Sequence, residues 1–347
     1  MESSIRWSRA SQSTLGVDAC RPTLPRGGGE RIETGARKGV DFAERFVLGA
    51  SRDSFGERDF KGVTGVQDHQ AGAKKMESKG TIIGIVGSPN RDGRTNQLVA
   101  AALQGAAQAG ASTELIQMAD NVVSACKDCL PWVCAAAKKC SYEDPAFELL
   151  SRKLLSCGAL IFGTPIYWWD TSGMVRYFFL KTFRVFARSA PLQGLPAFGI
   201  GVAGGTGNGL VSGLRPLYQF FQVMQMRALE PLPVTRFNFD ESIERARQLG
   251  GELAGMAEKH TPFASVEERL LWYDNLPYLN LSRLEERRLL ADLAVTRLKN
   301  GDGAELALNL AVSDRLVAAR RTEQAAAGVT KVYEAAVRSF EKQDGQP

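Results

Sequence analysis

The feature that most constrains this chain is a buried strand that runs directly into a turn of small polar residues and then into a helix. Residues 81–86 read Thr-Ile-Ile-Gly-Ile-Val, an apolar, β-branched run typical of a strand buried on both faces. Residues 87–96 are rich in glycine, serine, threonine and asparagine, and from Leu98 to Leu103 apolar residues recur at helical spacing. Such a turn directs N–H groups and hydroxyls to the positive end of the helix dipole, where a phosphate group can bind.

The composition of this turn narrows the ligand that it could hold. Residues 84–96 contain neither the Gly-Lys-Ser/Thr ending of a P-loop nor the G-x-G-x-x-G of a dinucleotide fingerprint. A turn of hydroxyl and amide side chains suits the single terminal phosphate of a mononucleotide such as FMN. An ordinary strand–turn–helix connection that binds nothing is the open alternative.

Strand and helix patterns continue to alternate beyond this turn. We expect strands at about 81–87, 112–117, 159–163, 196–202 and 227–233, and helices at about 95–109, 145–155, 171–188, 209–226 and 241–259. Such alternation with short connections predicts an α/β fold in which helices cover both faces of a parallel sheet. Five strands suggest a doubly wound, flavodoxin-like sheet of order 2-1-3-4-5, which binds ligands beyond the carboxyl ends of its strands.

Composition divides the chain into three regions. Residues 1–75 are rich in Arg, Ser and Gly without apolar periodicity, which indicates a disordered leader. Met76 stands just ahead of the first strand, so an over-extended start is a plausible origin of this leader. Residues 76–261 contain the predicted FMN-binding domain with a cysteine-rich insert at 124–142. Residues 262–347 predict a helical C-terminal extension, and its breaks are expected at 275–277, 300–303 and 328.

Several function classes find no support in the sequence. The net charge of +5 is spread without a basic run, so we expect no nucleic-acid partner. The chain has neither a secretory signal nor the roughly 18 consecutive apolar residues of a membrane span. We therefore expect a cytoplasmic protein without a membrane partner. The two histidines, His69 and His260, lie away from the candidate loops, so a Ser-His-Asp hydrolase has no basis and a bound cofactor must supply the chemistry.

Two further loops at predicted carboxyl ends have unusual compositions. Within residues 163–173, Tyr167, Trp168 and Trp169 are adjacent, and aromatic side chains can stack on a flat ring system. For the tryptophans, a role in the core or in a dimer interface is the alternative, whereas we favour Tyr167 as a ligand-side residue. Residues 203–209 place four glycines in six positions, which lets the backbone approach a ligand closely, unless the segment is only a flexible turn.

Four cysteines lie within fifteen positions, in the spacing C-x₂-C-x₄-C-x₅-C: Cys126, Cys129, Cys134 and Cys140. Four thiolates on one short segment can hold a [4Fe–4S] cluster, which is the interpretation we favour. Structural zinc usually takes its four cysteines from two C-x₂-C pairs, and only one pair is present. Zinc, a redox dithiol and free thiols stay open as alternatives. Cys20 lies in the leader, and Cys157 opens a predicted buried strand.

The loops resemble those of a known family. Gly87-Ser88-Pro89 with Arg94-Thr95-Asn96 resembles the phosphate loop of NADPH-dependent FMN reductase-like flavoproteins, in the flavodoxin-like superfamily. Residues 164–168 resemble their second flavin loop. The cysteine segment between the second strand and the next helix is similar to that of the iron–sulfur flavoprotein branch, although Cys129 and Cys134 are two residues further apart than is usual there. The resemblance covers about 81–230.

The resemblance implies a role for each matching residue, and no side chain is expected to be catalytic because the flavin carries the chemistry. The FMN phosphate would be held by Ser88, Asn90, Arg94, Thr95 and Asn96. The isoalloxazine ring would lie along Pro165, Tyr167 and Trp168, and its pyrimidine edge would meet Gly204, Gly205 and Thr206. The [4Fe–4S] ligands would be Cys126, Cys129, Cys134 and Cys140.

The resemblance also implies an activity. It predicts an FMN-dependent oxidoreductase that uses NAD(P)H as a transient donor and passes electrons between FMN and a [4Fe–4S] cluster, a small-molecule acceptor or a redox protein. It further implies a homo-oligomer, either a dimer or a tetramer. Two alternatives remain: an NAD(P)H-dependent flavin or quinone reductase whose cysteines bind zinc or are free, and a flavodoxin-like electron carrier.

Overall fold

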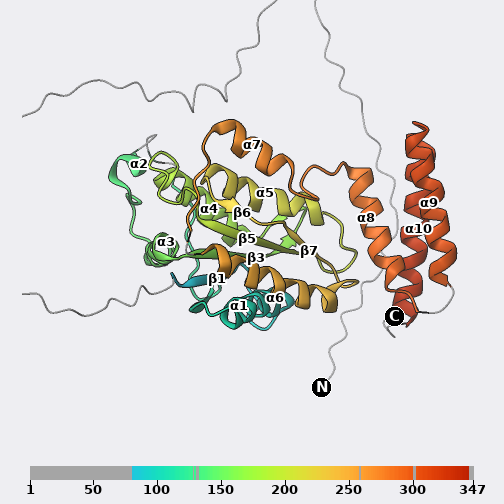
Figure 1. Ribbon diagram of the computed structural model, residues 1–347, viewed down its shortest axis with the longest axis horizontal. Helices are drawn as coiled ribbons and strands as arrows, with labels where there is room; N and C mark the ends of the chain where they lie inside the picture. The colour runs from blue at the N-terminus through green and yellow to red at the C-terminus, as the bar shows by residue number, and fades with distance from the viewer. Residues whose placement is uncertain (1–79, 128, 130–132, 258, 300–301, 344–347) are drawn as a thin grey trace, which may run out of the picture. The chain divides into compact units, whose positions relative to one another are not determined.

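The computed structural model describes residues 80–127, 129, 133–257, 259–299 and 302–343 (Figure 1). The expected leader, with its start site, lies outside the described residues. Among the helices of the described ranges, none is long and apolar enough to cross a lipid bilayer.

A parallel sheet forms the centre of the α/β region (Figure 1). Its strands are β1 (Ile82–Val86), β2 (Thr113–Gln117), β3 (Ala159–Tyr167), β5 (Pro196–Val202), β6 (Arg227–Ala228) and β7 (Leu232–Val234). They follow the order β2-β1-β3-β5, and β6 and β7 both pair in parallel with β5. The predicted order 2-1-3-4-5 is therefore confirmed, with the expected fifth strand divided into two short pieces.

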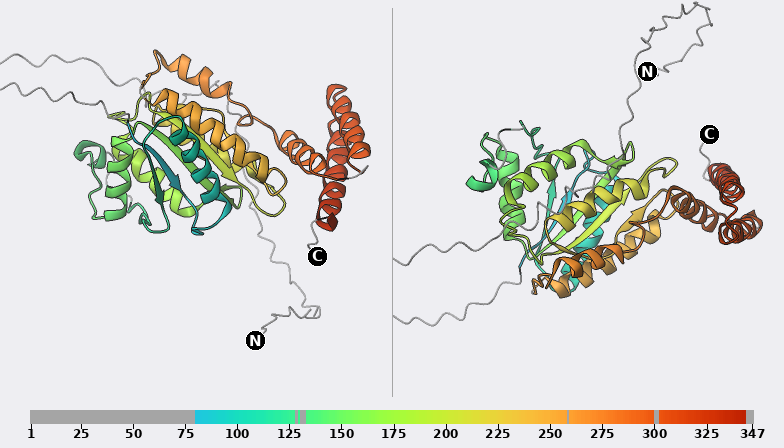
Figure 2. Two further views of the ribbon diagram at one scale, coloured as in Figure 1. Left: turned by 60° about the horizontal axis from the view of Figure 1, so that its bottom comes forward. Right: turned by 90° about the horizontal axis from the view of Figure 1, so that it is seen from above.

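Helices cover both faces of this sheet (Figure 2). One face carries α1 (Arg94–Gln108) and α6 (Phe239–Met256). The other carries α3 (Pro145–Ser156), α4 (Gly173–Phe186) and α5 (Leu210–Val223). Because successive side chains of a strand point to opposite faces, Ile82 and Val86 pack with α1 and α6, whereas Ile83 and Ile85 pack with the other three helices.

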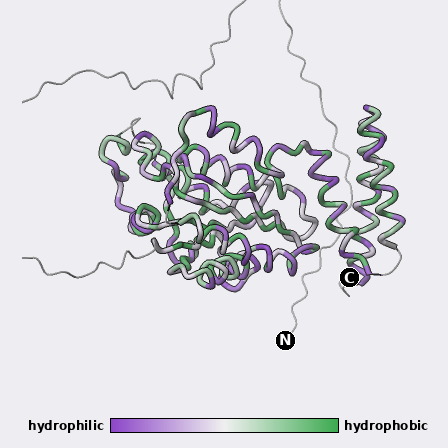
Figure 3. Tube along the Cα trace, in the orientation of Figure 1, coloured by the Kyte–Doolittle hydropathy of each residue, from purple (hydrophilic) through white to green (hydrophobic). Residues whose placement is uncertain are grey.

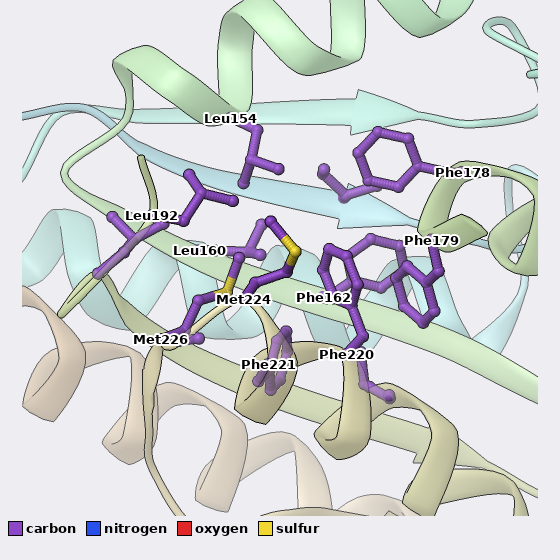
Figure 4. Packing of buried hydrophobic residues seen from close by; sticks show 14 of the residues in the cluster. Leu154, Leu160, Phe162, Phe178, Phe179, Leu192, Phe220, Phe221, Met224 and Met226 are labelled. Carbon is purple, nitrogen blue, oxygen red and sulfur yellow. The ribbon is translucent and has the colours of Figure 1, made fainter. Parts of the chain in front are cut away.

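Aromatic side chains fill the core on the second face (Figure 4). Phe162 of β3 lies beside Phe178 and Phe179 of α4, and the ring centroids of Phe162 and Phe179 are 5.2 Å apart. Phe179 in turn stacks on Phe220 of α5, with centroids 4.1 Å apart. This packing fixes α4 and α5 against β3, the strand whose carboxyl end carries the aromatic loop.

The structure corrects the predicted loop at 163–173. β3 continues to Tyr167 and forms a hairpin with β4 (Asp170–Thr171), in which Tyr167 pairs with Asp170. Trp168 (φ 53°) and Trp169 (φ 60°) form the two-residue turn, and a type I′ turn requires positive φ at both central residues. The usual Asn-Gly signal for such a turn is absent at positions 168–169, so the sequence does not predict the hairpin.

The C-terminal region is helical, as expected. It comprises α7 (Val266–Asp274), α8 (Arg283–Thr296), α9 (Asp302–Ala318) and α10 (Thr322–Gln343). Figure 3 shows hydrophobic and hydrophilic residues alternating along α10, the pattern of an amphipathic helix, and its apolar residues Val329, Val332 and Tyr333 are buried. The break at 275–277 is confirmed, while residues 300–301 lie outside the described residues.

The break expected at Gly328 is wrong, because this glycine lies inside α10. A Cβ at Gly328 would lie 2.5 Å from the Ser313 hydroxyl of α9, so glycine allows the two helices to pack closely. The chain reverses instead near Arg320, where φ is 58°.

Two glycines control the packing of α1 against α6. A Cβ at Gly105 of α1 would lie 1.9 Å from the carbonyl oxygen of Arg247, and a Cβ at Gly250 of α6 would lie 1.9 Å from that of Ala102. Neither neighbour can yield, because both atoms belong to helical backbone. Glycine is therefore required on both sides of this contact.

We predict that Gly105→Ala lowers the free energy of unfolding by at least about 2 kcal/mol, because the added methyl group forces the two helices apart. The measurement is the urea midpoint followed by circular dichroism. Gly255→Ala on α6 is the matched control, since its Cβ would meet nothing within 4 Å. Equal midpoints for the two variants would show that the close contact is not required.

Candidate functional site

A buried hydroxyl joins the first two loops of the carboxyl edge. The Gly87 N–H donates to the Gly163 carbonyl oxygen over 2.7 Å, and the Ser172 hydroxyl donates to the Gly87 carbonyl oxygen, also over 2.7 Å. The Ser172 N–H donates in turn to the Thr164 hydroxyl, 3.3 Å away. Ser172 is 3% exposed. These bonds hold the end of β1 against the end of β3, so the phosphate-type turn and the aromatic hairpin have a fixed separation.

The turn after β1 presents an uncapped helix N-terminus. Ser88 and Thr95 are buried, and the Ser88 hydroxyl accepts a hydrogen bond from the Asn90 N–H over 3.1 Å. Gly93 occupies the N-cap of α1 without any side-chain capping bond, and the first turn contains no acidic residue. The N-terminus of α1 therefore has no side-chain cap for its first N–H groups, which is the arrangement that binds an anion.

The other predicted phosphate residues have different surroundings. The Asn96 amide oxygen accepts from Gln117 Nε2 of β2 over 2.8 Å, so this side chain faces the neighbouring strand. The Asn90 amide oxygen accepts from the Asp92 N–H within the turn. The Arg94 guanidinium lies over the Phe239 ring, 5.3 Å from its centroid. Of the predicted phosphate residues, Ser88 and Thr95 are therefore the two with buried hydroxyls beside the uncapped N-terminus of α1.

The hairpin after β3 exposes aromatic surface at the same edge. Tyr167 is 52% exposed and Trp168 is 89% exposed, and the Trp168 and Trp169 rings meet edge to face with centroids 5.7 Å apart. Pro165 is buried within β3 and pairs with Val202 of β5, so it lies beneath this edge. A large apolar side chain that is so exposed on a tight turn is suited to contact a ligand or a partner.

The glycine loop after β5 adjoins the hairpin. Gly204, Gly205 and Thr206 are exposed, and a Cβ at either glycine would meet nothing within 4 Å. A Cβ at Gly209 would lie 2.6 Å from Cδ1 of Trp169, so these two loops touch. The three predicted loops therefore meet at one edge of the sheet.

The C-terminal helices hold the glycine loop from its outer side. The Tyr333 hydroxyl of α10 donates to the Thr206 carbonyl oxygen. The Glu286 carboxylate of α8, 5% exposed, accepts from the Val211 N–H over 3.2 Å and from the Ser212 hydroxyl over 3.4 Å. A carboxylate at this position caps the N-terminus of α5. No local sequence signal reveals these contacts, because their partners are separated by 74 to 127 residues.

The structure brings together one pair of the four clustered cysteines. The sulfur atoms of Cys129 and Cys134 are 3.7 Å apart, Cys134 is buried, and Cys126 and Cys140 are half-buried. Within the described ranges, no three His, Cys, Asp or Glu side chains are gathered as metal ligands. Although burial alone would raise the pKa of Cys134, its hydrogen bonds with Cys129 and Ser141 lower it. The hydrogen bond with Cys134 raises the pKa of Cys129, so Cys134 is the more readily ionised thiol of the pair.

A buried ion pair closes the base of the cysteine segment. The Lys181 ammonium of α4 donates to the Asp144 carboxylate and, over 2.8 Å, to the Ser124 hydroxyl, so both ends of the segment are tied to one helix. Burial would raise the pKa of Asp144, but its hydrogen bonds with Lys181, Phe147 and Ser124 lower it below its usual range. One turn later, Arg184 donates to the Cys129 carbonyl oxygen over 2.7 Å.

Cys157 is separate from this segment. Its thiol donates to the Leu154 carbonyl oxygen, and burial raises the pKa of Cys157 to about 12. The thiol is therefore protonated at neutral pH and lies outside the cysteine segment, which makes it a suitable control.

Comparison with known proteins finds a matching family model and a curated relative, and the names of both describe flavin-dependent proteins. Residues 81–233 match the family model described as NADPH-dependent FMN reductase. An iron-sulfur flavoprotein of Methanocaldococcus jannaschii is 26% identical over 187 residues, which cover 50% of this chain and 95% of the relative.

Solved structures with a similar arrangement share little sequence with this chain. An NAD(P)H:quinone oxidoreductase from Methanothermobacter marburgensis is 14% identical, with a TM-score of 0.41, over 50% of this chain and 98% of its own. A flavodoxin, WrbA-like protein from Agrobacterium tumefaciens is 17% identical, with a TM-score of 0.35, over 52% of this chain and 99% of its own. The fold assignment rests on the strand order and not on these structures.

We predict that Ser172→Ala lowers the free energy of unfolding by about 1–2 kcal/mol, because the buried Gly87 carbonyl oxygen loses its side-chain donor. The change is measured by urea unfolding. Ser156→Ala, at an exposed position near the end of α3, is the control and should change stability little. A Ser172→Ala variant as stable as this control would contradict the role given to the Ser172 hydroxyl.

Proposed function

We propose that this chain, whose residues 81–233 form an NADPH-dependent FMN reductase-like oxidoreductase domain, binds FMN where its three loops meet and takes electrons from NAD(P)H. The observation that carries the proposal is the convergence of the loops through the Ser172–Gly87 bond and the Trp169–Gly209 contact. A phosphate-type turn, exposed aromatic side chains and an open glycine backbone then lie along one edge, in the order that the parts of FMN require.

The residues present fit this cofactor. The uncapped N–H groups of α1, with Ser88 and Thr95, supply donors for the phosphate. Tyr167 and Trp168 supply flat apolar surface for the isoalloxazine ring, and the backbone of Gly204 and Gly205 can approach its polar edge without hindrance. Of the remaining predicted residues, Asn90, Asn96, Pro165 and Thr206 would surround these contacts or lie beneath them. The Arg94 guanidinium faces Phe239 of α6 instead.

The chemistry would come from the flavin and not from a side chain. Bound FMN can accept a hydride and release electrons singly or in pairs. The chain's own residues bind the phosphate, orient the ring and exclude water from it. A small-molecule acceptor or a redox protein would receive the electrons.

We further propose that the cysteine segment is a metal centre, with a [4Fe–4S] cluster as the first candidate. The donor set fits, because four thiols lie on one segment that Lys181 and Asp144 close at its base. The name of the 26% identical relative, an iron-sulfur flavoprotein, supports this assignment. The 3.7 Å separation of Cys129 and Cys134 equally favours two ligands of a single zinc ion, for which bonds of about 2.3 Å place tetrahedral sulfurs about 3.8 Å apart.

The chain is also proposed to form a homo-oligomer. An apolar groove of about 420 Å³ lies between α4 and α5, and the side chains along it include the half-exposed Leu180 and Val223. A second copy that covered this groove would remove that apolar surface from water.

We predict that Thr95→Val raises the dissociation constant for FMN by about tenfold or more, because a hydrogen bond to a charged phosphate is lost while the side-chain shape is kept. Affinity is measured by quenching of flavin fluorescence. The wild-type complex should also lose its flavin absorbance when NADPH is added without oxygen.

Thr330→Val, at an exposed position of α10, is the control and should leave FMN affinity unchanged. Equal affinities for the two variants would contradict the phosphate assignment. Flavin that binds but is not bleached by NADPH would favour the electron-carrier alternative.

We predict that Cys134→Ser removes most of the bound metal from anaerobically purified protein and leaves FMN binding intact, because the two functions occupy separate segments. Iron and zinc are measured by mass spectrometry, which also decides between the cluster and the zinc site. Cys157→Ala should retain the metal, because that thiol lies outside the segment. Metal content unchanged by Cys134→Ser would exclude this cysteine as a ligand.

A further inference from the structure

A cationic pocket lies beside the first turn of α1, and among its lining residues Arg94 alone belongs to the three loops. Its volume is about 220 Å³. Its walls include Arg94 of α1, Arg236 in the loop before α6, Phe239 at the start of α6, and Arg297 and Lys299, which follow α8. The family match ends at residue 233, so most of this lining comes from segments outside the matched region.

The pocket has an excess of positive charge. Four cations and one carboxylate, that of Asp240, line it. Arg297 pairs with Asp240 and Glu241, and Arg236 pairs with Glu341 over 2.7 Å. Across the described part of the chain, neither Arg94 nor Lys299 has an ion-pair partner. The Nε of Arg236 is buried without a hydrogen-bond acceptor.

The position of Arg94 is electrostatically unfavourable unless an anion binds nearby. It is the first residue of α1, where the helix dipole is positive, and the first turn has no acidic residue to offset its charge. Stacking on Phe239 holds its guanidinium on the α6 side. A bound anion would relieve the repulsion between the guanidinium and the helix end.

The pocket differs from the site proposed for the flavin phosphate. Thr95 packs against β3, because a Cβ at Gly163 would lie 3.0 Å from the Thr95 Cγ2 atom. Arg94 points instead to α6 and the C-terminal helices. Neither Ser88 nor Thr95 lines the pocket. Consecutive residues therefore face two separate positions for an anion.

We propose that this pocket binds a phosphomonoester dianion other than the flavin phosphate, so that the C-terminal extension contributes directly to ligand binding. Guanidinium groups bind phosphate oxygens through paired, charge-assisted hydrogen bonds, and a phosphate group fits within the observed volume. The phosphomonoester could be the 2′-phosphate of NADPH, in which case the inference rests on the proposed function, or that of a separate phosphorylated metabolite.

The test is calorimetric titration of FMN-loaded protein with inorganic phosphate. We expect saturable binding that Lys299→Gln weakens about tenfold, because one charge-assisted contact is lost and no ion pair is broken. Lys331→Gln removes the same charge from an exposed position of α10 outside the pocket and should have no effect. FMN affinity should be equal in all three proteins. Absence of saturable binding, an equal loss in the control, or a parallel loss of FMN affinity would each overturn the proposal.

The source of the phosphomonoester follows from steady-state kinetics. A rise in KM for NADPH but not for NADH in Lys299→Gln identifies the 2′-phosphate. Unchanged values for both nucleotides, together with weaker phosphate binding, identify a separate phosphorylated ligand. If the protein does not bind FMN, the proposed function fails, while the same phosphate titration of the unloaded protein still decides whether the pocket binds phosphate.

Discussion

The hydrogen bond from Ser172 to the Gly87 carbonyl oxygen is the interaction on which the site depends. It joins the end of β1 to the start of α4 across the carboxyl edge of the sheet. The junction tolerates little change, because a Cβ at Gly87 would lie 2.3 Å from the Val175 side chain. The turn that could hold a phosphate and the hairpin that could stack on a ring therefore keep a fixed separation.

The C-terminal helices complete the same edge. Tyr333 fixes the Thr206 carbonyl group, and Glu286 caps the helix that follows the glycine loop. Burying a carboxylate costs free energy unless its oxygens are hydrogen-bonded. Loss of the bonds from Val211 and Ser212 would therefore destabilise the buried Glu286 carboxylate. The segment beyond the family match is thus tied to the candidate site through this loop, and it also supplies cations to the cationic pocket beside α1.

Local patterns in the sequence were sufficient to place the strands and the turn after β1, although β3 runs on to Tyr167 and the expected fifth strand is divided. Buried parallel strands are apolar throughout, and this signal extends over consecutive residues such as 81–86. The hairpin at Trp168 and Trp169 has no sequence signal, because both central residues have positive φ, which tryptophan rarely adopts. Gly328 was misread as a break, since sequence alone does not distinguish a glycine that ends a helix from one that allows close helix packing.

The residues of the candidate site also divide into those that a local sequence pattern predicts and those that it does not. Ser88 and Thr95 follow from a local motif, whereas Ser172, Glu286 and Tyr333 act on partners distant in sequence and have no local signature. The surroundings of Asn96 and Arg94 likewise depend on Gln117 and Phe239, which lie on other elements. Sequence patterns identified the three candidate loops, and only the three-dimensional structure identifies the residues that hold them in place.

The most direct test of this account is titration of the purified protein with FMN and with riboflavin, followed by quenching of flavin fluorescence. The account predicts saturable quenching at one FMN per chain, and binding of riboflavin weaker by at least about tenfold because it lacks the phosphate. Unsaturable quenching by FMN, or equal affinity for the two flavins, would contradict it.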